Sequence, residues 1–149
     1  MRGPEDVVHN ARNGASLEDV QAWMAEANVS DWLHLCEAGV FMGALDLVDA
    51  WSVHLTPTQA AVLEMVRIRA AIGRLNEEVI EAALAVCSSQ DTRDFSLEGR
   101  VRMERGLFRF EQGDHEGARD DLTWAETRLK SVAKASRDHE ATDALLDSW

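Results

Sequence analysis

The sequence predicts an all-α fold of about seven or eight helices in antiparallel pairs, stacked as a bundle or solenoid. Apolar residues recur at helical spacing along most of the chain, and no segment alternates apolar and polar residues as a half-buried strand does. Glycine also stands two residues before a bulky or ring side chain at three places: Gly39/Phe41, Gly73/Leu75 and Gly113/His115. The first two glycines are 34 residues apart, the length of a helix–turn–helix unit that must stack on a copy of itself to bury its apolar stripe.

An N-terminal helix and a first helix pair are predicted in the first third of the chain. Ser16 is a typical N-cap for a helix over residues 16–28, because its hydroxyl can accept a hydrogen bond from a free backbone N–H. The first repeat-like pair, 30–54, starts at a second N-cap serine, and Gly39 is expected to end its first helix. The second helix of this pair carries an inward stripe made of Ala44, Val48, Trp51 and Leu55.

The second pair is expected over residues 57–87. Thr56 followed by proline is a strong helix start, since proline at the first helical position loses no donor that the helix needs. The helix 57–72 is apolar around almost its whole circumference, so we expect it to be central and contacted on several sides. Gly73 then ends it, and Asn76 caps the helix that follows.

The third pair, 96–134, follows a polar loop over residues 88–94. Its second helix, 115–134, carries an apolar stripe made of Ala118, Leu122, Ala125, Leu129 and Val132. A weaker C-terminal helix, 137–149, is expected to cap the exposed end of the stack, as the terminal elements of repeat arrays must.

Composition predicts a single soluble domain of 149 residues in the cytoplasm. Hydrophobic residues make up 46 % of the chain, but no apolar run is long enough to cross a bilayer of about 30 Å, and the first residues lack the apolar segment of a secretory signal. Cys36 and Cys87 both fall on expected helices and are predicted to be buried free thiols. The net charge of −12 argues against binding to nucleic-acid phosphates.

One segment, 104–126, has small and apolar residues at the positions of a known repeat: Gly106, Gly113, Asp114, Ala118, Leu122 and Ala125. This segment resembles a tetratricopeptide repeat, and poorer matches cover 31–51 and 60–85, so that the resemblance spans about 28–134. The resemblance implies a stack of degenerate repeats without catalytic activity. Members of this family commonly hold a peptide in the groove lined by the first helices of their repeats.

The first helix of the third pair departs from that resemblance. The positions where the family usually places large apolar residues hold Arg102, Arg105 and Arg109, which share one helical face. Together with Arg67 or Arg69 they would form a basic strip in an acidic protein, suited to bidentate hydrogen bonds with carboxylates. The implied ligand is an acidic peptide of a partner protein.

Two readings of these residues stay open. The arginines could instead form a structural network with acids, namely Glu98 on the same helical face and Glu64, Glu78 or Glu81 on other helices. Trp124 lies off the apolar stripe of its helix, so it either docks the C-terminal helix or anchors a partner.

Two other functions start from weaker patterns. Glu77, Glu78 and Glu81 form the EExxE half of the metal signature of all-α nucleotide pyrophosphohydrolases, but acids are also expected in the first turns of a helix. Residues 55–66 resemble the opening of a LuxR-type helix-turn-helix, yet no basic recognition helix follows them. The sequence therefore predicts no enzyme, no cofactor, no metal site, no nucleic-acid partner and no membrane partner.

The function expected from these patterns is protein binding, as an adaptor, chaperone or regulatory scaffold. Two alternatives remain from the sequence alone. The chain could be the sensing or oligomerisation repeat region of a larger transcriptional regulator, or it could assemble into a homodimeric scaffold.

Overall fold

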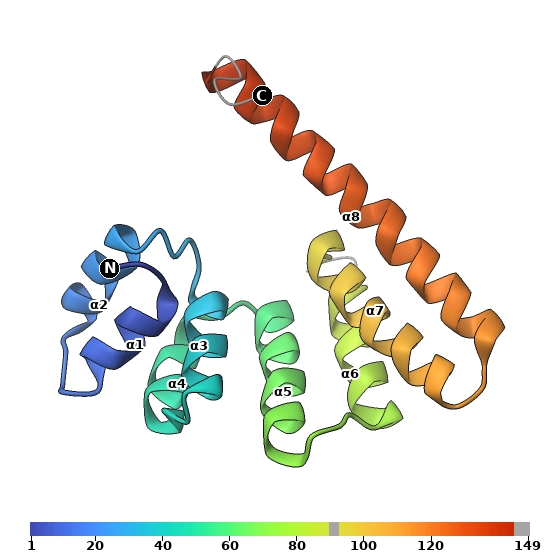
Figure 1. The fold of residues 1–149 in the computed structure, drawn as a ribbon, viewed down its shortest axis with the longest axis horizontal. Coiled ribbons are helices and arrows are strands. Elements are labelled where there is room, and N and C mark those ends of the chain that lie inside the picture. The colour runs from blue at the N-terminus through green and yellow to red at the C-terminus, as the bar shows by residue number, and fades with distance from the viewer. Residues whose placement is uncertain (90–92, 145–149) are drawn as a thin grey trace. The chain divides into compact units, whose positions relative to one another are not determined.

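The computed structural model describes the backbone of residues 1–89 and 93–144, and the side chains of residues 1–89, 93–128 and 130. These residues form helices and no strand (Figure 1), as the sequence predicts for an all-α chain. The elements are α1 (Pro4–Ala11), α2 (Leu17–Glu26), α3 (Trp32–Phe41), α4 (Leu45–Trp51), the 3-10 turn η1 (Ser52–His54), α5 (Pro57–Ile72), α6 (Glu77–Cys87), α7 (Phe95–Glu111) and α8 (His115–Ala144). They divide into two compact units, Met1–Leu75 and Asn76–Trp149. That the two behave as a single domain stays a prediction.

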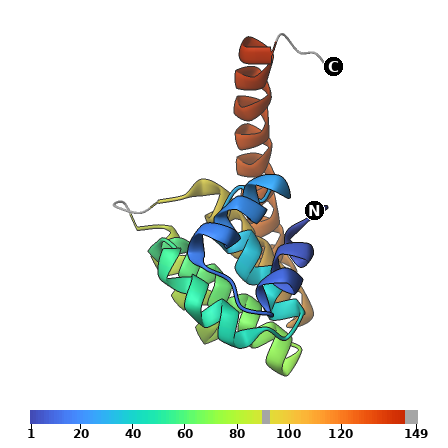
Figure 2. The same ribbon diagram turned by 90° about the vertical axis from the view of Figure 1, so that its left-hand side faces the viewer.

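Helix α3 is the centre of the first unit. It contacts α1, α4, α5 and η1 (Figures 1 and 2). Six of its ten residues are buried. The apolar composition of α5 predicts this central place for α5, and that prediction is wrong. Helix α5 buries Thr58, Val62, Leu63 and Met65, but it leaves Ile72 at its end 69 % exposed. Helix α3 carries only His34 and Glu37 as polar residues, whereas α5 carries a glutamate and two arginines and ends in an exposed turn.

Helix α1 was not among the expected elements. Pro4 occupies its first turn and Glu5 and Asp6 follow, which is the composition that favours a helix start. Val7 and Val8 are fully buried, and α1 contacts both α2 and α3. The segment is too short to show a periodic pattern by itself, so its burial against α3 stabilises it.

The expected helix starts are largely confirmed. Ser16 accepts a hydrogen bond from the backbone N–H of Asp19 at 3.1 Å, and Asn76 accepts one from Val79 at 2.9 Å. Thr56 forms a reciprocal capping box with Gln59 at the start of α5. The cap of α3 is Asp31 rather than Ser30, because the aspartate carboxylate accepts from the backbone N–H of His34 at 2.9 Å.

The turn expected at Gly39 is wrong. Gly39 lies inside α3 and is buried, and the chain turns instead at Gly43, whose φ is +73°. A Cβ on Gly39 would lie 2.6 Å from Cγ2 of Val48 on α4, so the absence of a side chain lets the two helices approach closely. Gly73 and Gly113 do take left-handed conformations at turns. The left-handed glycines are Gly14, Gly43, Gly73 and Gly113, so the 34-residue period between turns does not hold.

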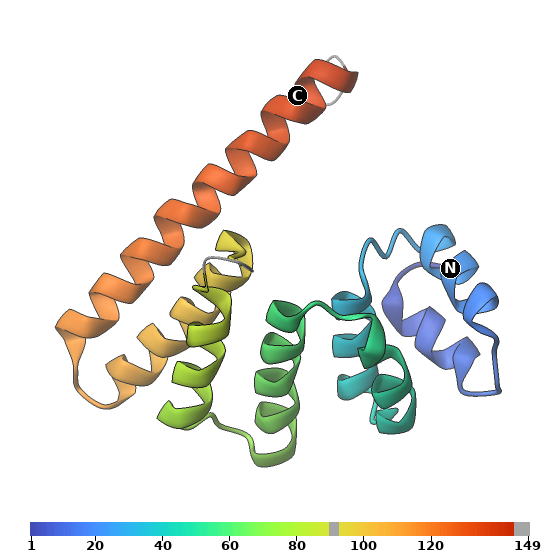
Figure 3. The same ribbon diagram turned by 180° about the vertical axis from the view of Figure 1, so that it is seen from behind.

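Helix α7 lies between α6 and α8 in the second unit (Figure 3). Gly106 permits close packing of α7 on α8, because a Cβ there would lie 2.9 Å from Cγ of Leu122. A break is expected between helices 115–134 and 137–149, but α8 runs without interruption to Ala144. The reason is the absence of glycine and proline after Gly117. Residues 145–149 lie outside the described residues.

Both cysteines are buried free thiols, as the sequence predicts. Burial raises the pKa of the Cys36 thiol and that of the Cys87 thiol from 9.0 to about 11. The folded chain therefore keeps two protons that the unfolded chain releases, and we expect the free energy of unfolding to fall as the pH rises from 9.0 towards about 11.

Urea unfolding across this pH range tests that expectation, with the Cys36→Ala, Cys87→Ala double variant as the control. The variant should lose part of the alkaline decline, because other groups titrate in the same range but these two no longer do. An identical decline in both proteins would contradict the assignment.

Candidate functional site

The second unit has a buried carboxylate on each of its two longest helices. Glu98 of α7 is 0 % exposed and Asp121 of α8 is 1 % exposed. A charged carboxylate is costly to bury unless cations and hydrogen-bond donors surround it. The arginines of α7 supply these groups.

Asp121 is the acceptor at the centre of the α7–α8 contact. Arg105 donates to both of its oxygens, from Nε to Oδ2 at 3.0 Å and from Nη2 to Oδ1 at 2.8 Å. Arg109 donates from Nη1 to Oδ2 at 2.9 Å, and Nη1 of Arg102 lies 3.6 Å from Oδ1. Arg105 also donates from Nη1 to Glu81 of α6 at 3.1 Å, so one guanidinium ties three helices together. The hydrogen bonds to Asp121 raise the pKa of Arg105 above its ordinary value, which keeps it charged.

Glu98 is held by two further arginines. Arg93 donates from Nε to Oε1 at 3.1 Å and from Nη2 to Oε2 at 3.3 Å. Nε of Arg102 lies 3.4 Å from Oε2 of Glu98, but the geometry is not that of a hydrogen bond. Arg102 therefore neutralises two carboxylates by proximity while its Nε–H remains without an acceptor among the described residues.

Beside these carboxylates, guanidinium groups and aromatic rings alternate on the surface of the second unit. The guanidinium carbon of Arg102 lies 4.3 Å from the ring centroid of Trp124, and that of Arg128 lies 5.4 Å from the same ring. Arg128 also lies 5.0 Å from the centroid of Phe95, and Arg93 lies 4.7 Å from it. These distances are those of cation–π contacts. We call the set Arg93, Phe95, Arg102, Trp124 and Arg128 the arginine–aromatic surface.

This surface is partly open to solvent. Phe95 is 40 % exposed, the side chain of Arg93 is 38 % exposed, and Arg128 is exposed. Among the described residues, no carboxylate forms an ion pair with Arg128, whose guanidinium group lies near the two rings. Two guanidinium groups of this surface, those of Arg93 and Arg102, have Glu98 and one edge of Asp121 as their anionic partners.

Six residues were candidates for partner binding from the sequence, and they fall into three groups. Arg105 and Arg109 donate to Asp121, an acid that the structural alternative did not include, and Arg105 also donates to Glu81, which it did include. Arg102 and Trp124 contact each other on the arginine–aromatic surface. Arg67 and Arg69 belong to the first unit, where Arg67 pairs with Asp49 at 2.9 Å.

Residues 137–144 do not form a separate helix that packs on Trp124. Those residues continue α8, and one straight helix cannot fold back onto an earlier turn of itself. The Leu145, Leu146 and Trp149 side chains expected to cover Trp124 lie outside the described residues. The contacts of Trp124 that the structure does describe are those with Arg102 and Arg128.

Sequence reasoning missed the role of Asp121, which is the main anchor of the network. Its signal was present: Ala118, Asp121 and Ala125 are spaced i, i+3 and i+7, so the aspartate lies on the apolar face of its helix. Arg93 and Phe95 were also missed, because they follow a polar loop and carry no periodic signal.

The acidic EExxE sequence does not form a metal site among the described residues. No group of three or more His, Cys, Asp or Glu side chains there is arranged to hold a metal ion, and Glu81 of the EExxE sequence instead pairs with Arg105. None of the described helices is both long enough and apolar enough to cross a bilayer. Comparison of the chain with protein-family models, curated proteins and solved structures finds no match.

Proposed function

We propose that this chain is a non-enzymatic protein-binding module whose arginine–aromatic surface holds an acidic segment of a partner protein. The observation that carries the proposal is the position of Arg128, an exposed guanidinium stacked on two rings and without a carboxylate partner in the described part of the chain. This keeps the expectation of an acidic peptide ligand but moves the site from Arg105 and Arg109 to the neighbouring surface.

The chemistry of the surface supports a carboxylate ligand. Arginine presents its donors in a planar fork that matches the two oxygens of a carboxylate. The ring contacts hold the guanidinium groups of Arg102 and Arg128 in place before any ligand arrives, so less side-chain entropy is lost on binding.

The remaining charge of the protein supports specificity. The chain carries 27 acidic and 15 basic residues, so an acidic partner is repelled by most of its surface. A basic surface within an acidic molecule selects the orientation of an anionic partner more strongly than a uniformly basic protein would. An adaptor or regulatory scaffold with a cytoplasmic location is the role that fits this mode of binding.

Arg128→Glu is expected to weaken binding of an acidic peptide by about tenfold or more, because a like charge then stands against the ligand. The probe is a short labelled peptide that alternates glutamate and serine, followed by fluorescence anisotropy at low and high salt. Binding by the unchanged chain should weaken as salt rises, since the contact is between exposed charges.

Arg74→Glu is the matched control, because Arg74 is an exposed arginine of the first unit and its replacement changes the net charge equally. It should bind the peptide nearly as well as the unchanged chain. Equal losses in the two variants would mean that only net charge matters, and failure of the unchanged chain to bind the acidic peptide would overturn the proposal.

A further inference from the structure

Helix α7 turns Glu98, Arg102 and Arg105 inward and an apolar stripe outward. Met103, Leu107 and Phe110 are spaced i, i+4 and i+7, and they are 42 %, 48 % and 58 % exposed. A helix of a soluble protein normally turns the opposite way, with its apolar stripe towards the core. Three large apolar side chains in one exposed row indicate a surface that another chain covers.

This stripe borders a groove between the end of α7 and the start of α8. The groove has a volume of about 460 Å³, and Phe110, Ala118 and Leu122 contribute its apolar lining. His115 packs edge-on against Phe110 with 5.0 Å between ring centroids, which fixes one end of the groove. All of these residues belong to the second unit.

The charges beside the groove are self-complementary. Arg119 and Glu126 both line it, and they stand two helical turns apart on α8, about 10 Å along the axis. Glu126 pairs with Lys130 at 2.7 Å, and this hydrogen bond lowers the pKa of Glu126, so its carboxylate stays charged. Arg119 is exposed and has no carboxylate partner among the described residues.

We propose that the occupant of this groove is a second copy of the same chain, packed across a two-fold axis that passes near Leu122. In such an arrangement a residue and its partner exchange roles between the two copies. Antiparallel packing of α8 on its copy places Arg119 of each copy opposite Glu126 of the other, and both ion pairs form at once.

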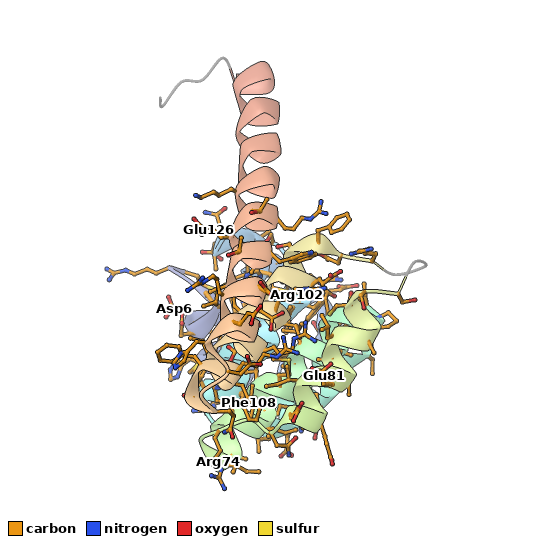
Figure 4. The ribbon with its side chains drawn as sticks, turned by 90° about the vertical axis from the view of Figure 1, so that its right-hand side faces the viewer. Asp6, Arg74, Glu81, Arg102, Phe108 and Glu126 are labelled. Carbon is orange, nitrogen blue, oxygen red and sulfur yellow. The ribbon has the colours of Figure 1, made fainter. Side chains whose placement is uncertain are left out.

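The same packing covers the apolar stripe. Two α7–α8 hairpins facing each other make a four-helix arrangement, with Met103, Leu107, Phe110 and Leu122 of both copies in its interior. Figure 4 shows Glu126 and Arg102 on opposite sides of α8. The dimer surface is therefore separate from the arginine–aromatic surface, and the inference goes beyond the proposed peptide binding.

The test is a charge exchange between two variants of the full chain. Arg119→Glu leaves two acids at each contact and Glu126→Arg leaves two bases, so each variant alone should have a dimer dissociation constant raised by about tenfold or more. An equimolar mixture should form a mixed dimer, because both opposite-charge pairs are then restored. Light scattering during size-exclusion chromatography, over a concentration series, measures the mass in each case.

A third variant tests the apolar part of the same contact. Phe110→Asp should give monomers with an unchanged helical circular dichroism spectrum, while Val53→Asp, at a 77 % exposed apolar residue of the first unit, should leave the dimer intact. A monomeric unchanged chain at every concentration overturns the proposal, and so does a mixture of the charge variants that stays monomeric. A dimer that survives Phe110→Asp would place the interface elsewhere. Acidic-peptide binding by the charge variants should be retained, which separates this test from that of the proposed function.

Discussion

Replacing Asp121 with alanine is expected to destabilise the second unit by about 3–5 kcal/mol, because it leaves buried guanidinium groups without their counter-ion. Arg105, whose side chain is 14 % exposed, loses two hydrogen bonds, and Arg109 loses one. Glu81 remains as the partner of Arg105, but it belongs to α6 and cannot hold α8 in place. The packing of α8 on α7 should therefore weaken most.

Hydrogen exchange of the backbone amides of α7 and α8 measures this effect segment by segment. Asp120→Ala is the matched control, since Asp120 is the exposed neighbour on the same helix and its replacement also removes one negative charge. We expect that control to change the stability by less than about 0.5 kcal/mol. Equal losses of stability in the two variants would show that the buried Asp121 stabilises the fold no more than the exposed Asp120 does.

Gly39→Leu is expected to destabilise the first unit by about 3 kcal/mol, at the upper end of the usual cost of overpacking a core. The first atom of the new side chain would lie 2.6 Å from Cγ2 of Val48, and ring atom Cζ3 of Trp51 lies 3.9 Å from the same position. Val48 is 0 % exposed and Trp51 is 6 % exposed, so neither can move aside into solvent. Helices α3 and α4 would have to separate.

A double variant identifies the cause of that loss. Val48→Ala removes the atom in conflict, so the combined cost of Gly39→Leu and Val48→Ala in urea unfolding should be smaller than the sum of the two single costs. Phe41→Leu on the same helix, at a side chain that is 75 % exposed, should change little. Simple additivity of the Gly39 and Val48 effects would contradict the close approach of the two helices.

The parts of the fold that could be predicted from the sequence are those that depend on local chemistry. Thr56-Pro57 and Gly73 bound α5 where the sequence places them, and Asn76 caps α6, because capping needs only a side chain and the backbone of the next turn. The wrong predictions concern contacts between distant segments. A glycine at a helix end and a glycine at a helix crossing look alike in sequence, and only packing distinguishes Gly39 from Gly73.

In the candidate site, too, local features could be predicted from the sequence and contacts between distant segments could not. Helical spacing alone places Arg102, Arg105 and Arg109 on one face. Which of them binds the buried carboxylate and which contacts the exposed ring depends on the residues of α8. Asp121 decides that division, because it accepts hydrogen bonds from Arg105 and Arg109 and leaves Arg102 to stack on Trp124. An aspartate on an apolar helix face is therefore the pattern that best indicates a buried arginine network in such a chain.

The central claim is that Arg102, Arg93 and Arg128 bind carboxylates of a partner, whereas Arg105 and Arg109 hold the fold together. Side-chain NMR of the arginine Nε–H groups, recorded while the acidic peptide is added, tests this most directly. We expect the signals of Arg93, Arg102 and Arg128 to shift with the peptide concentration and those of Arg105 and Arg109 to stay in place. Shifts confined to Arg105 and Arg109, or no shift in any arginine, would contradict it.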